Sequence, residues 1–274
     1  MAALNVIDIS DHQAGISLPT MFEKNPDLDA VIVKATEGTG YVNKYCDPWV
    51  QWLIKNNKPW GFYHYLSGTK DSGAVEADYF YKHCLNYFGH GIAICDLEGN
   101  AVNRGPTYTK QFLDRIYQLS GVRPMVYMSL SVIQSYGTGF DPTVADGYKL
   151  WLAQYATTQV VYGFKKTPWQ KGSVAPWPTI TMHQYSDHGR LNGYLADLDL
   201  GIFYGTVNDW NNIARSYKPS PTPEPEPEPQ PTPTPDPEPS PDIPTGNNLQ
   251  IAIGLLEYAT ELLKEYENGT ADNK

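Results

Sequence analysis

The chain has 274 residues, of which 41% are hydrophobic, 13% aromatic and 18% charged, a composition typical of a folded protein with one large domain and further segments. Its net charge of −10 is concentrated near the C-terminus: residues 219–245 hold six acids and no base, and residues 246–274 hold five acids and two lysines. The remaining 19 acids and 18 bases lie in residues 1–218, so this region has no basic excess and we expect it not to bind nucleic acid. No run of 18 apolar residues occurs, so we expect no membrane span.

The N-terminus shows no pattern of a secretion signal. Met1 is followed almost directly by the strand-like segment Leu4–Ile7, with neither a basic region nor a long apolar core, so we expect synthesis in a cytoplasm without a signal peptide. The three cysteines, Cys46, Cys84 and Cys95, match no disulfide framework and no zinc spacing. We therefore expect three reduced thiols and no metal site.

Residues 1–218 alternate short apolar runs with helical segments. Helical segments are expected at 48–56, 72–85 and 107–120, between the earlier strands. The expected strands are Asn5–Ile9, Ala30–Ala35, Trp60–Tyr65, Gly91–Cys95, Pro124–Met128, Leu150–Gln154, Thr179–Gln184 and a last one near Tyr194–Asp199. Eight strands with intervening helices predict a parallel α/β barrel, and the short, irregular connections after the sixth strand predict a modified closure.

Acidic residues follow several of these strands. Asp96 and Glu98 follow the fourth strand, and because residues i and i+2 of a strand share a face, their carboxyls should lie close together. Two adjacent carboxyls raise the pKa of one of them, which provides a proton donor beside an anion. Glycoside hydrolysis requires this combination. Asp8 and Asp197, with Asp199 as the alternative to Asp197, are expected at the same end of the barrel.

Eight sequence blocks in order resemble glycoside hydrolase family 25, the Chalaropsis-type lysozymes, which include many phage endolysins. The resemblance covers residues 4–218. The blocks are Ile7–Gln13, Val33–Gly38, Gly61–Tyr65, Asp96–Glu98, Pro124–Tyr127, Leu150–Tyr155, His183–Ser186 and Ala196–Asp199. The resemblance implies a TIM-like (β/α)5(β)3 barrel and cleavage of peptidoglycan between N-acetylmuramic acid and N-acetylglucosamine.

The same resemblance assigns roles to the acidic residues. It maps the general acid to Glu98, the assisting carboxylate to Asp96, and two further acids to Asp8 and Asp197. Asp199 stands where many relatives have asparagine, so the choice between Asp197 and Asp199 is open, and we expect Asp197. Whether Asp96 orients the substrate's acetamido group or activates water is also open, and we expect the acetamido route with net retention.

Further side chains at strand ends are expected to bind substrate. Tyr63 and Tyr127 should line the cleft, and Glu37 either completes an acidic floor or forms a structural salt bridge. The full set of expected substrate-binding residues is Tyr63, Tyr65, Tyr127, Trp151, Gln184 and Glu37. No glycine-rich phosphate loop and no Ser/His/Asp order occurs, so we expect no cofactor.

The leading hypothesis is an endolysin-type muramidase that waits in the host cytoplasm and reaches the wall after holin-type release. A bacterial autolysin and a non-catalytic wall-binding barrel are the alternatives. A chitinase-like barrel is disfavoured, because Ile94 and Gly91 occupy the places where that signature carries further aspartates.

The composition changes after Lys218. Residues 219–246 have proline at nearly every second position, which predicts an extended, acidic polyproline-II linker. Residues 247–274 contain an expected amphipathic helix at Asn247–Glu267. Its apolar residues recur at three- and four-residue steps, and an isolated helix cannot bury such a stripe. We therefore expect a wall-targeting or oligomerisation segment, with homo-oligomerisation through this helix as the favoured role.

Overall fold

The computed structural model of the chain describes residues 2–69 and 71–215. Eight strands close into a barrel, because β1 pairs with β2 on one side and with β10 on the other. Around the ring these strands are β1 (Leu4–Ile9), β2 (Ala30–Glu37), β4 (Trp60–Tyr65), β5 (Ile92–Asp96), β6 (Met125–Ser129), β7 (Leu150–Ala153), β9 (Met182–Arg190) and β10 (Leu198–Phe203). Two short strands lie outside this ring: β3 (Tyr41–Val42) pairs with β2, and β8 (Val161–Tyr162) pairs with β9.

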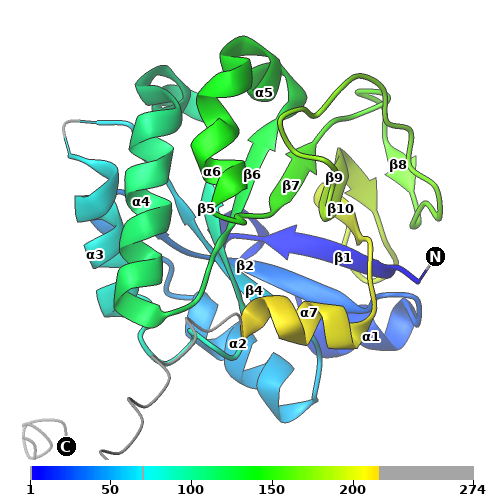
Figure 1. Cartoon of the computed structure of the whole chain (residues 1–274). Helices are drawn as coiled ribbons and strands as arrows, with labels where there is room; N and C mark the ends of the chain where they lie inside the picture. The colour runs from blue at the N-terminus through cyan, green and yellow to red at the C-terminus, as the bar shows by residue number, and fades with distance from the viewer. Residues whose placement is uncertain (1, 70, 216–274) are drawn as a thin grey trace, which may run out of the picture. The chain divides into compact units, whose positions relative to one another are not determined.

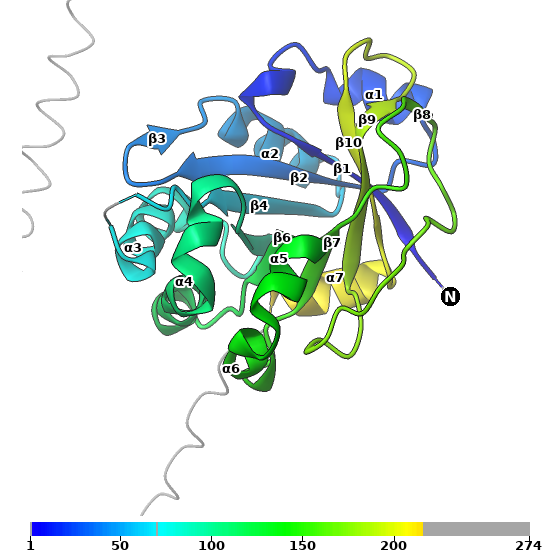
Figure 2. The ribbon, with the colours of Figure 1, turned by 90° about the horizontal axis from the view of Figure 1, so that it is seen from above.

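Helices follow each of the first five barrel strands. They are α1 (Leu18–Lys24), α2 (Cys46–Lys55), α3 (Gly73–Cys84), α4 (Gly105–Ser120), and the pair α5 (Leu130–Tyr136) and α6 (Asp141–Ala145). Residues 154–181, all of them described, contain only β8 and no helix. Figures 1 and 2 show the helices around the parallel strands, with loops in place of helices beside β7, β8 and β9. This arrangement confirms the predicted barrel of five β/α units followed by three strands.

The last barrel strand differs from the prediction in position and direction. It covers Leu198–Phe203 rather than a segment near Tyr194–Asp199, and it runs antiparallel to both β9 and β1. All other neighbouring pairs among the eight barrel strands are parallel. The beginning of β10 therefore lies at the same end of the barrel as the carboxyl ends of the other strands.

The alternation of side chains along the strands divides the core into two layers. On β5, Ile92 and Ile94 face the barrel interior, whereas Ala93 and Cys95 belong to the layer between barrel and helices. Leu97 continues that outer layer. Because successive strand residues point to opposite faces, Asp96 is directed into the barrel at the point where the apolar interior ends.

Helix α7 (Val207–Ala214) closes the opposite end of the barrel. Trp210 is buried against Phe203 in the inner cluster, and its indole nitrogen donates a 3.0 Å hydrogen bond to the carbonyl of Trp60 at the start of β4.

No helix within residues 2–69 and 71–215 has the length and apolar character needed to cross a bilayer. The predicted linker at 219–246 and the predicted helix in 247–274 lie outside the described residues.

Candidate active site

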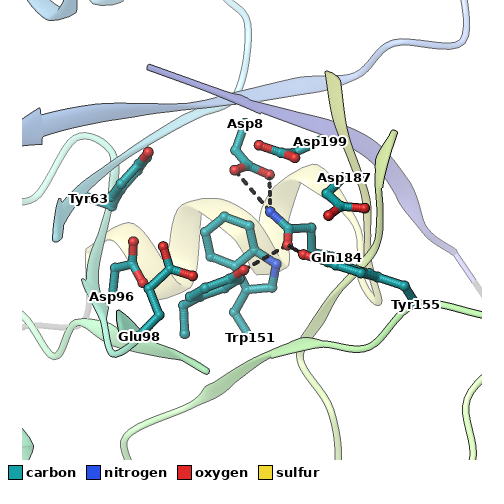
Figure 3. A pocket seen from close by; sticks show the side chains of 10 residues that line it. Asp8, Tyr63, Asp96, Glu98, Trp151, Tyr155, Gln184, Asp187 and Asp199 are labelled. Carbon is teal, nitrogen blue, oxygen red and sulfur yellow. Dashed lines mark hydrogen bonds between the residues drawn. The ribbon is translucent and has the colours of Figure 1, made fainter. Parts of the chain in front are cut away.

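Carboxyl side chains converge in a cavity of about 240 Å³ at the carboxyl end of the parallel strands (Figure 3). Asp8 comes from β1, Asp96 ends β5, Glu98 lies two residues further, and Asp199 is the second residue of β10. The complete lining is Asp8, Tyr63, Asp96, Glu98, Tyr127, Trp151, Tyr155, Gln184, Asp187 and Asp199. We refer to this cavity as the acidic pit.

Asp96 and Glu98 occupy different parts of the site although they share a face. Asp96 is only 6% exposed, and of the two cavities at this end of the barrel it lines only the acidic pit. Glu98 is exposed and also lines a second, open cavity of about 930 Å³ that continues along the ends of β6 and β7. We call this second cavity the groove. Glu98 therefore lies at the junction of pit and groove.

A hydrogen-bond network centred on Gln184 fixes the wall of the pit opposite Asp96. The Gln184 amide donates to both carboxylate oxygens of Asp8, at 3.1 and 3.0 Å. Its carbonyl oxygen accepts from the hydroxyls of Tyr127, at 2.7 Å, and Tyr155, at 2.5 Å. Gln184 is 3% exposed. Its side-chain NH₂ and carbonyl both have partners within the protein, namely Asp8, Tyr127 and Tyr155.

Burial and mutual repulsion favour the protonated forms of these carboxyls. Burial raises the pKa of Asp8 to about 7, and the negative charge of Glu98 contributes. Burial, followed by the charges of Glu98 and Asp8, raises the pKa of Asp96 well above its usual value, and partial desolvation beside the pit raises the pKa of Glu98. The group therefore holds protons near neutral pH, which general acid catalysis requires.

Two polar atoms at the pit have no hydrogen-bond partner within the described part of the protein. They are Oδ1 of Asp96 and the indole Nε1 of Trp151, and both are buried. Buried polar groups are normally paired, so these two atoms are available to a bound ligand.

Comparison with known proteins agrees with this geometry. Residues 7–194 match the sequence profile of glycosyl hydrolases family 25. The chain belongs to glycosyl hydrolases family 25.

Two curated proteins and one solved structure are similar to this family 25 chain. It is 29% identical over 139 residues to an N,O-diacetylmuramidase of Chalaropsis sp., an alignment that spans 45% of the chain and 65% of that enzyme. It is 24% identical over 204 residues to the autolytic lysozyme of Clostridium acetobutylicum, spanning 72% of the chain and 55% of that protein. The bacterial lysozyme of Streptomyces coelicolor has the same fold, with a TM-score of 0.63, 20% identity, and coverage of 78% of this chain and 98% of that one.

Asp199 lines the pit of this family 25 chain, whereas Asp197, which was expected there, does not; the catalytic assignment of either residue stays a prediction. Asp199 pairs in register with Asp8 across β1 and β10, and burial followed by the charge of Asp8 raises its pKa to about 9. Asp197 precedes β10 and is outside the pit lining; it forms an ion pair with Arg190, and its side chain is 48% exposed. The physical reason is the antiparallel course of β10, which brings Asp199 beside Asp8.

Four of the six expected substrate-binding residues line the acidic pit, and two do not. Tyr63, Tyr127, Trp151 and Gln184 line the acidic pit. Glu37 and Tyr65 are outside its lining. Glu37 forms a salt bridge with Lys34, with Nζ and Oε2 2.5 Å apart, which is the second of the two roles considered for it.

Sequence reasoning missed Lys34, Tyr155 and Asp187. Lys34 is 8% exposed, lies 4.8 Å from the ring centroid of Tyr65, and opposes the rise in the pKa of Asp96 and Glu98. Tyr155 and Asp187 line both the pit and the groove. Lys34 and Tyr155 lie within motif blocks, and Asp187 directly follows one, so their positions next to strand ends were the available signal.

Proposed function

We propose that the domain hydrolyses the β-1,4 bond between N-acetylmuramic acid and N-acetylglucosamine in bacterial peptidoglycan. The observation that carries this proposal is the position of Glu98 at the junction of the acidic pit and the groove. A polymer bound along the groove with one sugar in the pit places the linkage between two sugars at this carboxyl. The pit then holds the sugar on one side of the cleaved bond, and the groove holds the rest of the leaving chain.

In the proposed reaction, Glu98 gives its proton to the bridging oxygen as the bond from that oxygen to C1 breaks. The acetamido oxygen of the sugar in the pit attacks C1, and its N–H donates to the unpartnered Oδ1 of Asp96. Water then attacks C1, the bond to the acetamido oxygen breaks, and the water proton passes to Glu98. The configuration at C1 is retained and both carboxyls return to their initial states.

The proton that Asp96 and Glu98 share resides on Glu98 in the reactive form. Glu98 is exposed and can exchange protons with solvent, and the Lys34 ammonium together with the N–H of the bound acetamido group favours the ionised form of Asp96. The tyrosines and Trp151 of the pit provide the aromatic surfaces on which sugar rings pack.

Digestion of purified peptidoglycan, followed by an assay for new reducing ends, tests the activity. The wild type should release reducing ends, and Glu98→Gln should reduce release by about a hundredfold to ten-thousandfold, the contribution of a general acid. No release by the folded wild type, with binding to the wall retained, would favour the non-catalytic wall-binding barrel instead.

For the biological setting we propose an endolysin-type role: synthesis in a cytoplasm and access to the wall through a separate, holin-type pore. The three cysteines are free and buried, which fits a reducing compartment. The similarity to an autolytic lysozyme supports an autolysin as the alternative. Cells that express the chain should lyse only when a pore-forming protein is added, whereas lysis without a pore would favour the autolysin.

We also propose that residues 247–274 associate with copies of themselves, which would join several catalytic domains and increase avidity for a polymeric wall. The apolar spacing in Asn247–Glu267 supports this proposal. Light scattering should give a multiple of the monomer mass for the full chain and a monomer for a chain ending at Lys218. Equal monomer masses would refute it.

A further inference from the structure

Glu76 is a fully buried carboxylate that the proposed reaction does not use. It lies on α3, in the layer between barrel and helices, and its side chain has no exposed surface. Four donors from three elements surround it. They are His64 Nε2 at 3.0 Å, the backbone N–H of Ser67 at 2.9 Å, the Ser67 hydroxyl at 2.6 Å and the Tyr108 hydroxyl.

These hydrogen bonds keep Glu76 ionised. Burial alone would raise the pKa of Glu76, but the hydrogen bonds from His64, Ser67 and Tyr108 lower it to about 2. Burial also lowers the pKa of His64, so its neutral ring donates from Nε2 while Nδ1 accepts from the hydroxyl of Thr36, 2.7 Å away. Burying a carboxylate costs more free energy of folding than burying an apolar side chain of similar size. What Glu76 provides that an apolar residue cannot is its set of directional hydrogen bonds to His64, Ser67 and Tyr108.

The bonds to Ser67 fix the segment 66–69 between β4 and α3. Gly68 continues this fixation, because its N–H donates to the Tyr108 hydroxyl at 3.3 Å. Gly68 has a φ of 65°, and a Cβ there would lie 2.4 Å from Cα and N of Ala101. The segment 66–69 is therefore in direct backbone contact with the 3₁₀ turn Gly99–Arg104, and Arg104 adds a hydrogen bond to the carbonyl of Thr69.

This turn holds Glu98 in place. Glu98 precedes it as the N-cap residue, and the N–H of Ala101 donates to the Glu98 carbonyl at 3.2 Å. The N–H of Leu66 donates to the carbonyl of Asp96 at 3.0 Å, which connects the same segment to the other catalytic carboxyl. The Glu98 side chain makes no capping bond, so its carboxyl is free for the cleft.

We propose that Glu76 is a positioning residue for Glu98: its carboxylate fixes residues 66–69 from outside the barrel, and these residues hold the turn that carries Glu98. The inference rests on the proposed hydrolysis for its kinetic readout. It predicts that loosening the segment 66–69 displaces the general acid, while the Gln184 network on the opposite wall of the pit stays in place. A displacement of about 1 Å at a reacting group can lower a rate by about a hundredfold.

Two substitutions perturb the connection from opposite sides. Glu76→Gln replaces one acceptor oxygen by an NH₂ group that meets existing donors, and Gly68→Ala introduces a Cβ against the backbone of Ala101. Tyr108→Phe removes the hydroxyl that donates to Glu76 and accepts from the Gly68 N–H but leaves the Glu76 carboxylate in place, so it serves as the test if Glu76→Gln does not fold. The matched control is Asn25→Ala.

Asn25 is a buried polar centre at the end of α1, far along the chain from the Glu98 turn. Its side chain bonds to the backbone of Met21 at 2.9 Å and of Asn192 at 2.7 and 3.0 Å. Asn25→Ala should therefore lower thermal stability without moving Glu98.

For Glu76→Gln and Gly68→Ala we expect kcat on purified peptidoglycan to fall about tenfold or more, with KM within about twofold, because the pit and groove that bind substrate are retained. Amide hydrogen exchange in residues 97–104 should become faster in both variants and stay unchanged in Asn25→Ala. Tyr108→Phe should show the same effects to a smaller extent.

Wild-type kcat in both variants, or losses no larger than that of Asn25→Ala at equal loss of stability, would overturn the positioning role. Unchanged exchange in residues 97–104 would overturn it as well. If the wild type releases no reducing ends, the proposed hydrolysis fails, and the exchange measurement still decides whether Glu76 fixes the Glu98 turn.

Discussion

Gln184 donates one hydrogen bond to each carboxylate oxygen of Asp8, at 3.1 and 3.0 Å. The two residues lie 176 positions apart, on β9 and β1, which are separated in the barrel only by β10. Because the Gln184 carbonyl also accepts from two tyrosines, one side chain determines the positions of three groups in the pit. The deep wall of the pit is therefore preorganised rather than dependent on ligand for its order.

Replacing Gln184 should weaken both stability and activity. Gln184→Leu leaves Asp8, Tyr127 and Tyr155 without their shared partner, and buried polar groups without partners destabilise a fold. We expect the free energy of unfolding to fall by about 1–3 kcal/mol in denaturant titrations. Tyr155→Phe, which removes one donor, should cost less than Gln184→Leu, and an equal or larger loss in Tyr155→Phe would contradict the central position of Gln184.

Asp199 and Asp197 should respond differently to the same change. We expect Asp199→Asn to reduce reducing-end release by about tenfold or more, because Asp199 lies beside Asp8 in the lining of the pit. Asp197→Asn is the matched control and should retain activity, since its side chain is half-exposed and paired with Arg190. The reverse ranking of the two variants would restore the assignment expected from the sequence.

The raised pKa of Asp199 also predicts how stability depends on pH. Its carboxyl has a pKa of about 9 in the fold, against 3.8 as the ordinary value, so between these values the native state holds a proton that the unfolded chain releases. Its contribution to stability is complete below pH 3.8 and declines as pH rises towards 9. Asp199→Asn should gain about 1–2 kcal/mol over the wild type at pH 8, with no gain near pH 4. A gain that is independent of pH would contradict the burial of an ionisable carboxyl at this site.

Lys34 should set the pH range of activity. Burial raises the pKa of Asp96 and Glu98, and the Lys34 ammonium opposes this rise. Lys34→Met should therefore move the alkaline limb of the kcat/KM profile to higher pH, because the general acid keeps its proton to higher pH. Lys34→Arg preserves the charge and should leave the profile close to that of the wild type. Identical profiles for Lys34→Met and the wild type would exclude this electrostatic role.

The barrel and the placement of Asp96 and Glu98 in one cavity could be predicted because they depend on local patterns. Asp96 and Glu98 are two residues apart at the end of a short apolar strand, and strand geometry alone places them on one face. The order of strand-like and helical segments predicts an eight-stranded barrel with a modified closure, and the division into five β/α units and three further strands follows from the resemblance to family 25. Cys95 and Leu97 are buried in the outer layer, as this alternation requires.

The last strand could not be placed in the same way. Tyr194 and Leu195 resemble strand residues, but Leu195 is 95% exposed and lies in the loop before β10. Gly193, with a φ of 96°, belongs to the same loop. The choice between Asp197 and Asp199 depended on this boundary and on the direction of β10, both of which tertiary pairing with β1 and β9 determines.

Long-range contacts explain why the sequence did not reveal the roles of Lys34 and Glu76. The salt bridge from Lys34 to Glu37 is local, but the approach of Lys34 to Asp96 and Glu98 depends on barrel closure. The Glu76 centre likewise joins β4, α3 and α4, and no sequence spacing reveals it. Such residues are found only once the elements are assembled.

The central claim is that Glu98 protonates the bridging oxygen between N-acetylmuramic acid and N-acetylglucosamine. Mass spectrometry of the fragments released from purified peptidoglycan tests it most directly, because it identifies the sugar at each new reducing end. The wild type should release fragments that end in N-acetylmuramic acid, and Glu98→Gln should release almost none. Fragments that end in N-acetylglucosamine, cleavage of peptide bonds alone, or equal release by Glu98→Gln would contradict it.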